Sequence, residues 1–183
     1  LHERESSGRG QFVDISMLDC QVAVQENAFM RYHLTGELPE RMGTRHPTAV
    51  PFQAFATKDG YLVLALALGV PNQWALLCSE LDRVELIDDP RFFSAAARSR
   101  NHAELEPLLQ EAFMAKTTAE WLQAFERLEI PSGPLNNIAQ VAADPQVAAR
   151  DMFRVVPHRV IGDLKLTNTP IKLSSTPGGI RGT

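Results

Sequence analysis

The side chains best suited to chemistry in this chain are its histidines, its cysteines and one serine in a proline-rich loop. His33, His46, His102 and His158 form no recognisable set of metal ligands with neighbouring cysteines or carboxylates. His46 precedes a proline in a loop, and His102 stands at a predicted helix start where we expect it to be solvated. The sequence therefore predicts no metal site.

Neither the serine nor the cysteines read as an activated nucleophile. Ser132 lies in Pro-Ser-Gly-Pro, which lacks the strand-turn-helix frame of a G-x-S-x-G elbow. Cys20 and Cys78 sit within apolar helical patterns and are far apart, so we expect two buried, reduced thiols. No base is identifiable near either kind of side chain, and we expect no catalytic residue within this chain.

A loop ahead of a predicted helix is a better candidate for binding. Gly69, Val70, Pro71 and Asn72 lead into the helix, whose N-terminus would offer unpaired N–H groups and a positive dipole end to an anion. The alternative, a plain strand-to-helix turn, stays open. Together with His46, these loop residues are the predicted substrate-binding residues.

These candidates flank a predicted β-hairpin. Two apolar runs, Phe52–Thr57 and Tyr61–Leu66, are separated by Lys58-Asp59-Gly60, and an Asp-Gly pair favours a tight antiparallel turn. A stiff loop from His46 to Pro51 precedes the hairpin, and the loop ending at Asn72 follows it. Two such loops held by one hairpin could form the wall of a pocket.

The rest of the chain predicts mainly helices in the centre with strands on either side, an α+β pattern. Thr117–Glu120 has the spacing of a capping box, and two prolines make residues 130–135 an extended loop. The predicted strands are 11–15, 152–158 and 163–167; the predicted helices are 17–34, 73–83, one from Asp88, 102–114, 117–128, 138–143 and 145–150. Gly36 should end the first of these helices, Asn136 or Asn137 should cap the helix 138–143, and Asp144 should start the last one.

Composition narrows the class of protein. The chain has 183 residues, a net charge of −4 and a pI near 5.7, which disfavours nucleic-acid binding. No apolar run reaches membrane-spanning length and no secretory signal is recognisable, so we expect a cytoplasmic protein that does not bind membranes. The first residue is Leu1, and the ends read as a helix tail and a linker start, which suggests a piece of a longer protein.

Several segments, in order along the whole chain, resemble family III CoA-transferases, the superfamily of formyl-CoA transferase, carnitine CoA-transferase and 2-methylacyl-CoA racemase. The first is Gly10–Asp19, similar to the family's GQ-x-VDVSLLD. The others are Gly43–Pro47, Pro51-Phe52, Phe55, Asp59-Gly60, Asp89–Phe92, Thr117–Trp121, Ile130–Pro134, Asn136, Asp144–Val147, Pro170 and Ser175–Pro177.

The resemblance implies a fold and an activity. It implies that residues 1–36 end a Rossmann-like α/β large domain, 37–50 form a linker, 51–150 form a small α+β domain of a hairpin and short strands packed with helices, and 151–183 form returning strands and a linker. Family members are homodimers of interlocked chains that act on acyl-CoA and carboxylic acids. Coenzyme A is a substrate, with no other cofactor, and an aspartate is the nucleophile.

Departures from the family pattern leave three alternatives open. The family's catalytic aspartate precedes the segment matched by Gly10, so it is absent here, and we expect this chain alone to be inactive. Only Gly69 remains of a glycine-rich loop. Racemases carry a glutamate near the position of Pro71, which cannot take a proton, and this favours a transferase over a racemase. A noncatalytic assembly domain is the third alternative.

In isolation the helix 17–34 should expose Phe29 and Met30.

Overall fold

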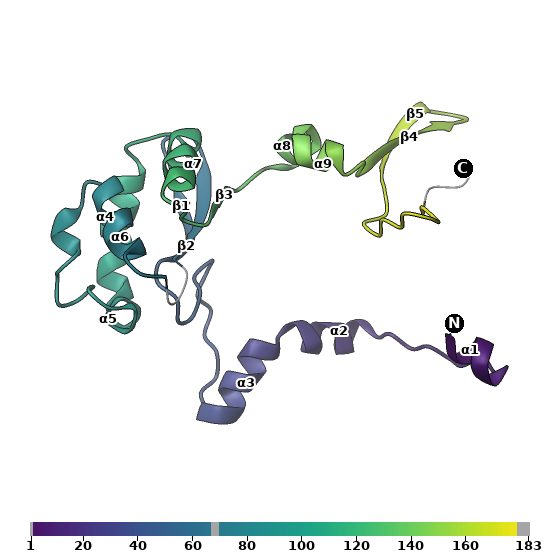
Figure 1. The fold of residues 1–183 in the computed structure, drawn as a ribbon, viewed down its shortest axis with the longest axis horizontal. Coiled ribbons are helices and arrows are strands. Elements are labelled where there is room, and N and C mark those ends of the chain that lie inside the picture. The colour runs from purple at the N-terminus through teal and green to yellow at the C-terminus, as the bar shows by residue number, and fades with distance from the viewer. Residues whose placement is uncertain (1, 67–69, 179–183) are drawn as a thin grey trace. The chain divides into compact units, whose positions relative to one another are not determined.

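The computed structural model describes residues 2–66 and 70–178. The chain divides into two compact units, Leu1–Gly43 and Thr44–Thr183. Figure 1 labels the helices and strands of both units along the chain.

The first unit consists of short helices. They are α1 (His2–Ser7), α2 (Met17–Val24) and α3 (Glu26–Thr35). The single helix predicted for this stretch is interrupted at Gln25, while Gly36, with φ of 74°, ends α3 as predicted. The strand predicted for 11–15 is wrong, because these residues have no strand neighbour in the part of the chain described.

The helices of the first unit present apolar side chains to solvent. None of the described residues before Thr44 is buried. Phe29 is 40% exposed and Met30 56%, which confirms the expected apolar surface on this segment. Cys20 is also exposed, so the prediction of a buried thiol there is wrong. An apolar helical pattern does not by itself predict that Cys20 is buried, because a helix face is buried only where another layer of the structure covers it.

A three-stranded antiparallel sheet organises the second unit. Its strands β1 (Phe52–Ala56), β2 (Tyr61–Ala65) and β3 (Ser132–Pro134) lie in the order β1-β2-β3. The predicted hairpin is confirmed. The segment expected to be only a loop supplies β3, with Gly133 paired to Val63. It lies at an edge of the sheet, where prolines are tolerated because the outer side has no ladder partner.

Helices pack against this sheet. They are α4 (Gln73–Glu80), the 3₁₀ helix η1 (Val84–Leu86), α5 (Ala95–Arg100), α6 (His102–Phe113) and α7 (Thr118–Arg127). The capping box of Thr117 and Glu120 forms as predicted. The helix start predicted at Asp88 is wrong: Asp89 instead accepts the Arg91 N–H at 2.8 Å in a turn, and α5 begins later, capped by Ser94.

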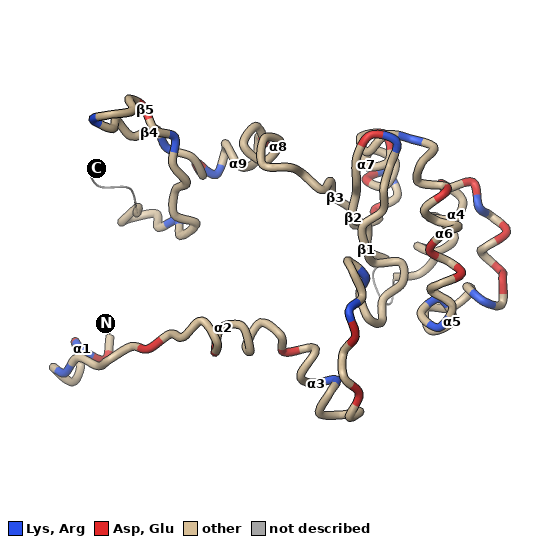
Figure 2. Tube along the Cα trace, turned by 180° about the vertical axis from the view of Figure 1, so that it is seen from behind, with Lys and Arg blue, Asp and Glu red and all other residues tan. Residues whose placement is uncertain are grey.

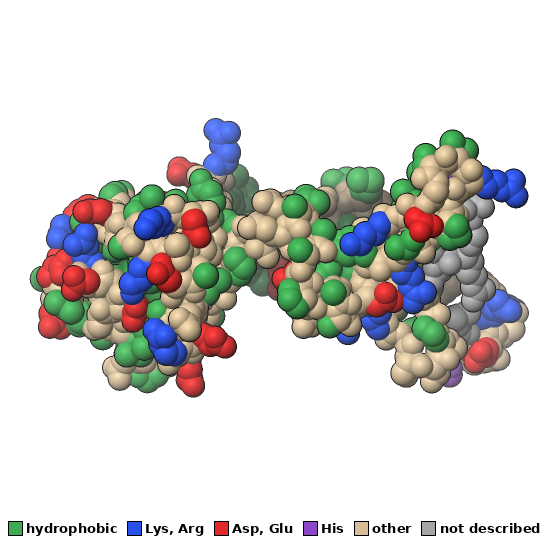
Figure 3. Space-filling model, turned by 90° about the horizontal axis from the view of Figure 1, so that it is seen from above, with side chains coloured by type: hydrophobic (Ala, Val, Ile, Leu, Met, Phe, Trp, Pro, Cys, Tyr) green, Lys and Arg blue, Asp and Glu red, His purple; other side chains and the backbone are tan. Residues whose placement is uncertain are grey.

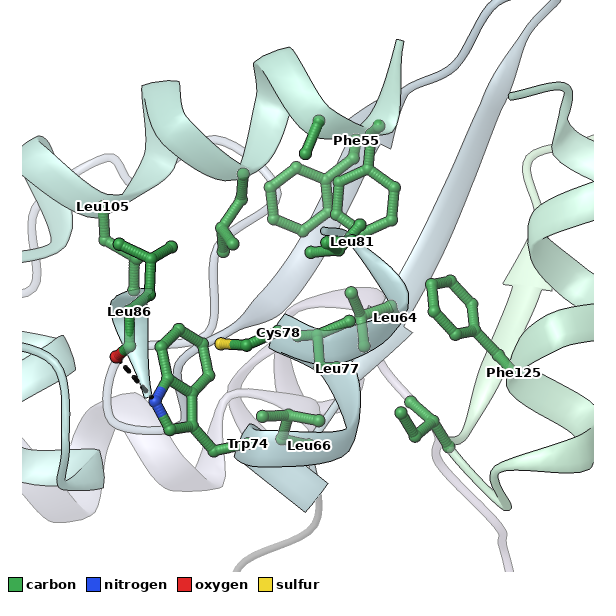
Figure 4. Packing of buried hydrophobic residues seen from close by; sticks show 14 of the residues in the cluster. Phe55, Leu64, Leu66, Trp74, Leu77, Cys78, Leu81, Leu86, Leu105 and Phe125 are labelled. Carbon is green, nitrogen blue, oxygen red and sulfur yellow. Dashed lines mark hydrogen bonds between the residues drawn. The ribbon is translucent and has the colours of Figure 1, made fainter. Parts of the chain in front are cut away.

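The core of the second unit lies between the hairpin and these helices (Figure 4). Trp74 on α4 donates from Nε1 to the Leu86 carbonyl at 3.2 Å, so its only polar atom is satisfied. An aromatic cluster continues the core, with the Phe55 and Phe113 ring centroids 4.5 Å apart. The buried residues include Leu62, Leu64, Leu77, Cys78, Leu105, Leu109, Trp121 and Phe125.

The remaining elements are α8 (Ile138–Ala143), α9 (Pro145–Ala149), β4 (Phe153–His158) and β5 (Gly162–Thr167). The last two strands form an antiparallel hairpin. The predicted caps are confirmed, because Asn137 accepts the Gln140 N–H at 2.9 Å and Asp144 accepts the Gln146 N–H at 2.7 Å. With two small antiparallel sheets and several helices, the structure has the mixed α and β composition that was expected.

Charged residues of both signs are interspersed over the second unit. In Figure 2, α5 carries blue segments and α6 carries red ones. Figure 3 shows both signs among apolar side chains on the face it displays. Within residues 2–66 and 70–178, no helix is long and apolar enough to cross a membrane.

Candidate functional site

The open end of the β1–β2 hairpin brings the two predicted loops together. Phe52 pairs with Ala65, and the Leu66 N–H donates to the Pro51 carbonyl at 3.0 Å. Since these residues begin and end the hairpin, the loop before β1 and the loop after β2 leave the sheet side by side. The second loop contains Gly69, a predicted site residue that lies outside the described residues.

The closed end of the hairpin is anchored to α7. The Asp59 carboxylate accepts the Thr118 N–H at 2.7 Å and the Thr118 hydroxyl at 3.1 Å. Thr57 also donates to this carboxylate, at 3.3 Å. The Thr118 N–H lowers the pKa of Asp59 below its usual value, since it stabilises the ionised form. The Asp-Gly turn thus holds the hairpin to a helix, which steadies the loops at its other end.

His46 organises the first of these loops. Its Nδ1 accepts the N–H groups of Thr48 at 3.2 Å and Ala49 at 3.0 Å. The backbone N–H of His46 donates to the Phe52 carbonyl at 2.9 Å. The His46 ring stacks on the Phe52 ring, with the two centroids 5.0 Å apart. Because a nitrogen that accepts these bonds carries no proton, the neutral ring keeps its proton on Nε2. Only Nε2 is therefore available to a ligand.

Val70, Pro71 and Asn72 form an exposed approach to α4. Asn72 adopts a left-handed backbone with φ of 64°, and its carbonyl accepts the Leu76 N–H at 2.9 Å. Its side chain makes no capping hydrogen bond. None of these three side chains titrates, so the segment can offer backbone and amide groups to a ligand but cannot remove a proton.

Arg98 on α5 ties the first loop to the helices. This buried guanidinium donates from Nε to the Val50 carbonyl at 2.7 Å and from Nη1 to the Phe92 carbonyl at 2.9 Å. It also lies 4.6 Å above the Trp74 ring at the start of α4. Burial lowers the pKa of Arg98. One side chain therefore joins both segments that flank the open end of the hairpin.

A second buried polar group lies beneath the first loop. His102 Nε2 donates to Gln53 Oε1 at 2.6 Å, and Gln53 Nε2 donates to Glu106 Oε1 at 2.9 Å. His102 Nδ1 lies 3.5 Å from the other oxygen of Glu106. The expectation of a solvated His102 is wrong, since only 5% of it is exposed. Burial, and then the positive charge of Arg45, lower the pKa of His102.

Sequence reasoning missed Gln53 and Arg98 at this site. Gln53 carries a signal, because it shares with Phe55 the inward-facing alternate positions of an apolar strand. A polar residue at such a position needs a buried partner, and His102 is that partner. Arg98 carries no such signal, because it stands among alanine, serine and a second arginine in a short helix whose burial only the fold decides.

No complete reaction centre is assembled by the residues that the structure describes. Burial raises the pKa of the Cys78 thiol to about 12, which leaves it protonated and inert near neutral pH. No group of three or more histidine, cysteine or acidic side chains could hold a metal ion among the described residues. Among the described residues, the open end of the hairpin thus offers contacts and hydrogen bonds.

Comparison with known proteins identifies the class that this combination defines. CoA-transferase family III matches the chain over residues 1–183. Human succinyl-CoA:glutarate CoA-transferase is 34% identical over 174 residues, covering 95% of this chain. An acyl-CoA transferase of Fusarium pseudograminearum is 37% identical over 183 residues, covering 99% of this chain. The chain belongs to CoA-transferase family III, as its motifs predicted.

Solved structures agree with this assignment. A CAIB/BAIF family protein from Brucella suis superposes with a TM-score of 0.76 at 34% identity, covering 96% of this chain and 45% of that one. The Rv3272 protein of Mycobacterium tuberculosis superposes equally well at 30% identity. The chain spans about two fifths of the length of its curated relatives, 39% of the human protein and 40% of the Fusarium protein.

Proposed function

We propose that the protein to which this chain belongs transfers coenzyme A from an acyl-CoA to a carboxylic acid. The observation that carries the proposal is the family match over the whole chain, together with relatives named as CoA-transferases. Besides the human protein, these include acetyl-CoA:oxalate CoA-transferase of Acetobacter aceti, 33% identical over 174 residues. Coenzyme A is then a substrate that moves between acids, and no further cofactor takes part.

The proposed route runs through an aspartate outside this chain. Its carboxylate attacks the acyl-CoA carbonyl and expels the CoA thiolate, which leaves a mixed anhydride. The thiolate then attacks the aspartyl carbonyl, releasing the first acid and leaving an aspartyl-CoA thioester. The acceptor carboxylate attacks this thioester, expelling the CoA thiolate and forming a second anhydride. The thiolate then attacks the acceptor's carbonyl and displaces the aspartate carboxylate. The products are the new acyl-CoA and the free aspartate.

The role we propose for this chain is to cover and shape that reaction centre. Residues 51–150 are the small α+β domain, and His46, Gly69, Val70, Pro71 and Asn72 contact substrate at the open end of the hairpin. The hydrogen bond of Leu66 to Pro51, which holds the two loops together, supports this assignment.

The remaining residues complete the proposed domain architecture. Residues 1–36 are the end of a Rossmann-like large domain, 37–50 the linker, and 151–183 the returning strands and a further linker. The exposed apolar side chains of α2 and α3 support a covering layer in the whole protein. The complete protein is proposed to be an interlocked homodimer.

A direct assay of the full-length protein tests this proposal. Succinyl-CoA would be offered with glutarate or oxalate, and the expected result is a new acyl-CoA together with a hydroxylamine-sensitive enzyme-bound thioester. The 183-residue chain alone should give neither product. A folded full-length protein that forms no acyl-CoA with any carboxylic acid, or that instead washes deuterium into the α-carbon of a 2-methylacyl-CoA, would refute the transferase proposal.

A further inference from the structure

A small cavity lies between the loop that precedes β1 and the helices α5 and α6. Its volume is about 50 Å³, enough for one small ion or a few waters rather than a whole substrate. All of its lining belongs to the second unit. The lining residues are Arg45, His46, Pro47, Val50, Ser99 and His102.

Three of the lining residues, Arg45, His46 and Ser99, are half-buried and carry side-chain N–H or O–H groups. The described residues offer no hydrogen-bond partner to the Arg45 guanidinium, the His46 Nε2 or the Ser99 hydroxyl. Of the two ring nitrogens of His46, Nδ1 already accepts two backbone N–H groups, so Nε2 is the one open to a ligand. All three groups can donate a hydrogen bond, and Arg45 cannot accept one. A ligand that satisfies them must therefore be an acceptor.

The charge around the cavity points the same way. No aspartate or glutamate lines it. Arg45 lies close enough to His102 for its positive charge to lower the pKa of that histidine, after the larger effect of burial. The nearest described carboxylate facing His102 is Glu106, which is also engaged by Gln53. The cavity therefore presents donors and positive charge without a counter-ion of its own.

We propose that this cavity binds one small anion, a halide or a single carboxylate group, held by Arg45, His46 and Ser99. The ligand has two conceivable sources: a free inorganic ion, or the carboxylate end of an organic acid. A water molecule is the competing occupant, and it differs in carrying no charge. The inference depends on the cavity and stands whether or not the proposed function is correct.

The pKa of His102 reports on this anion. A bound negative charge a few ångströms from the ring should raise that pKa by about 1, whereas water should leave it unchanged. The ring signals would be followed by ¹H–¹⁵N correlation NMR of the 183-residue chain, with His102→Gln assigning the resonance. The titration would exchange gluconate, an anion too large for the cavity, for chloride. The ionic strength would be held constant, so that general screening of charges does not change.

Variants separate a specific site from a general salt effect. Arg45→Gln should raise the pKa of His102 without any anion, because a neighbouring positive charge is gone, and should abolish its dependence on chloride. Ser99→Ala, which changes no charge, should weaken the chloride dependence several-fold. Arg100 is an exposed residue of α5, the helix that also carries Ser99. Arg100→Gln is therefore the matched control, and its chloride response should equal that of the unaltered chain.

The outcomes decide the proposal and the source of the ligand. The anion proposal is overturned if the pKa of His102 in the unaltered chain does not change with chloride. It is also overturned if that change is the same in Arg45→Gln and Ser99→Ala as in the unaltered chain; in either case water is the occupant. A response to chloride and formate that exceeds the response to succinate identifies a site for free small ions. A stronger response to succinate identifies the end of an organic acid.

Discussion

Arg98 Nε lies 2.7 Å from the Val50 carbonyl oxygen, so a guanidinium on α5 holds the last turn of the loop that precedes β1. The same side chain reaches the Phe92 carbonyl at 2.9 Å and stacks on Trp74. Three segments far apart in the sequence are thereby joined by one residue.

Replacing this residue should destabilise the second unit. Arg98→Met leaves two buried carbonyls without their charged donor and should cost about 2–4 kcal/mol in the free energy of unfolding. Arg98→Lys keeps the charge but loses the planar fork, so its cost should be intermediate. Urea denaturation measures both. Arg100→Met, on the exposed side of α5, is the control, and an equal loss in that variant would contradict the role of Arg98.

The buried His102 predicts a specific pH dependence of stability. Its pKa is lowered in the folded chain, so the unfolded chain binds more protons between that value and the ordinary 6.5. The stability that His102 contributes is thus fully present above pH 6.5 and is lost as pH falls through the folded pKa. Arg45 and Glu106, the charged groups facing it, partly oppose each other.

Chemical denaturation across this pH range would test the effect. In His102→Gln the same position cannot titrate, so the advantage of the unaltered chain over the variant should shrink below pH 6.5. A difference between the two that stays constant with pH would show that His102 is not the group responsible.

The turn at the closed end of the hairpin should show acid sensitivity. The pKa of Asp59 is lowered from its ordinary 3.8 by the Thr118 N–H, so its stabilising contribution is present above pH 3.8 and is lost as pH falls through the folded value. Asp59→Asn should lower the melting temperature at neutral pH, and the difference should close in acid. Asp88→Asn, an exposed carboxylate, serves as control; a gap that persists in strong acid would argue against this contact.

The two cysteines should react very differently. Cys20 is exposed, whereas Cys78 is buried with a pKa raised to about 12. A maleimide should therefore modify one thiol in the folded 183-residue chain and two in denaturant. Mass spectrometry counts the adducts, and Cys20→Ser should remove the fast reaction. Rapid labelling of Cys78 in folded Cys20→Ser would mean that α4 does not pack as described.

The sequence correctly predicted several features that depend on neighbours in the chain. The Asp59-Gly60 turn predicted the β1–β2 hairpin, and Thr117 and Asn137 predicted the starts of α7 and α8. In each case a short polar side chain or a glycine satisfies backbone groups within a few residues. The family motifs, spread over the whole chain, likewise predicted the family.

Predictions failed where the outcome depended on a distant partner. The helix start predicted at Asp88 is an exception, because Asp89 bonds locally within a turn to Arg91, two residues further on. His102 looks like a solvated residue at a helix start, but Gln53 of β1 makes it a buried one.

By itself, the sequence determined the hairpin, the capped helices and membership of CoA-transferase family III, because these depend on local backbone chemistry and on ordered motifs. Only the tertiary structure decided that Arg98 is buried beneath Val50, that Gln53 and His102 pair, and that Gly133 adds a third strand. These contacts join residues 48 to 70 positions apart in the sequence. Local propensity does not encode such pairings, because burial of a polar side chain is stabilising only where the fold supplies its partner.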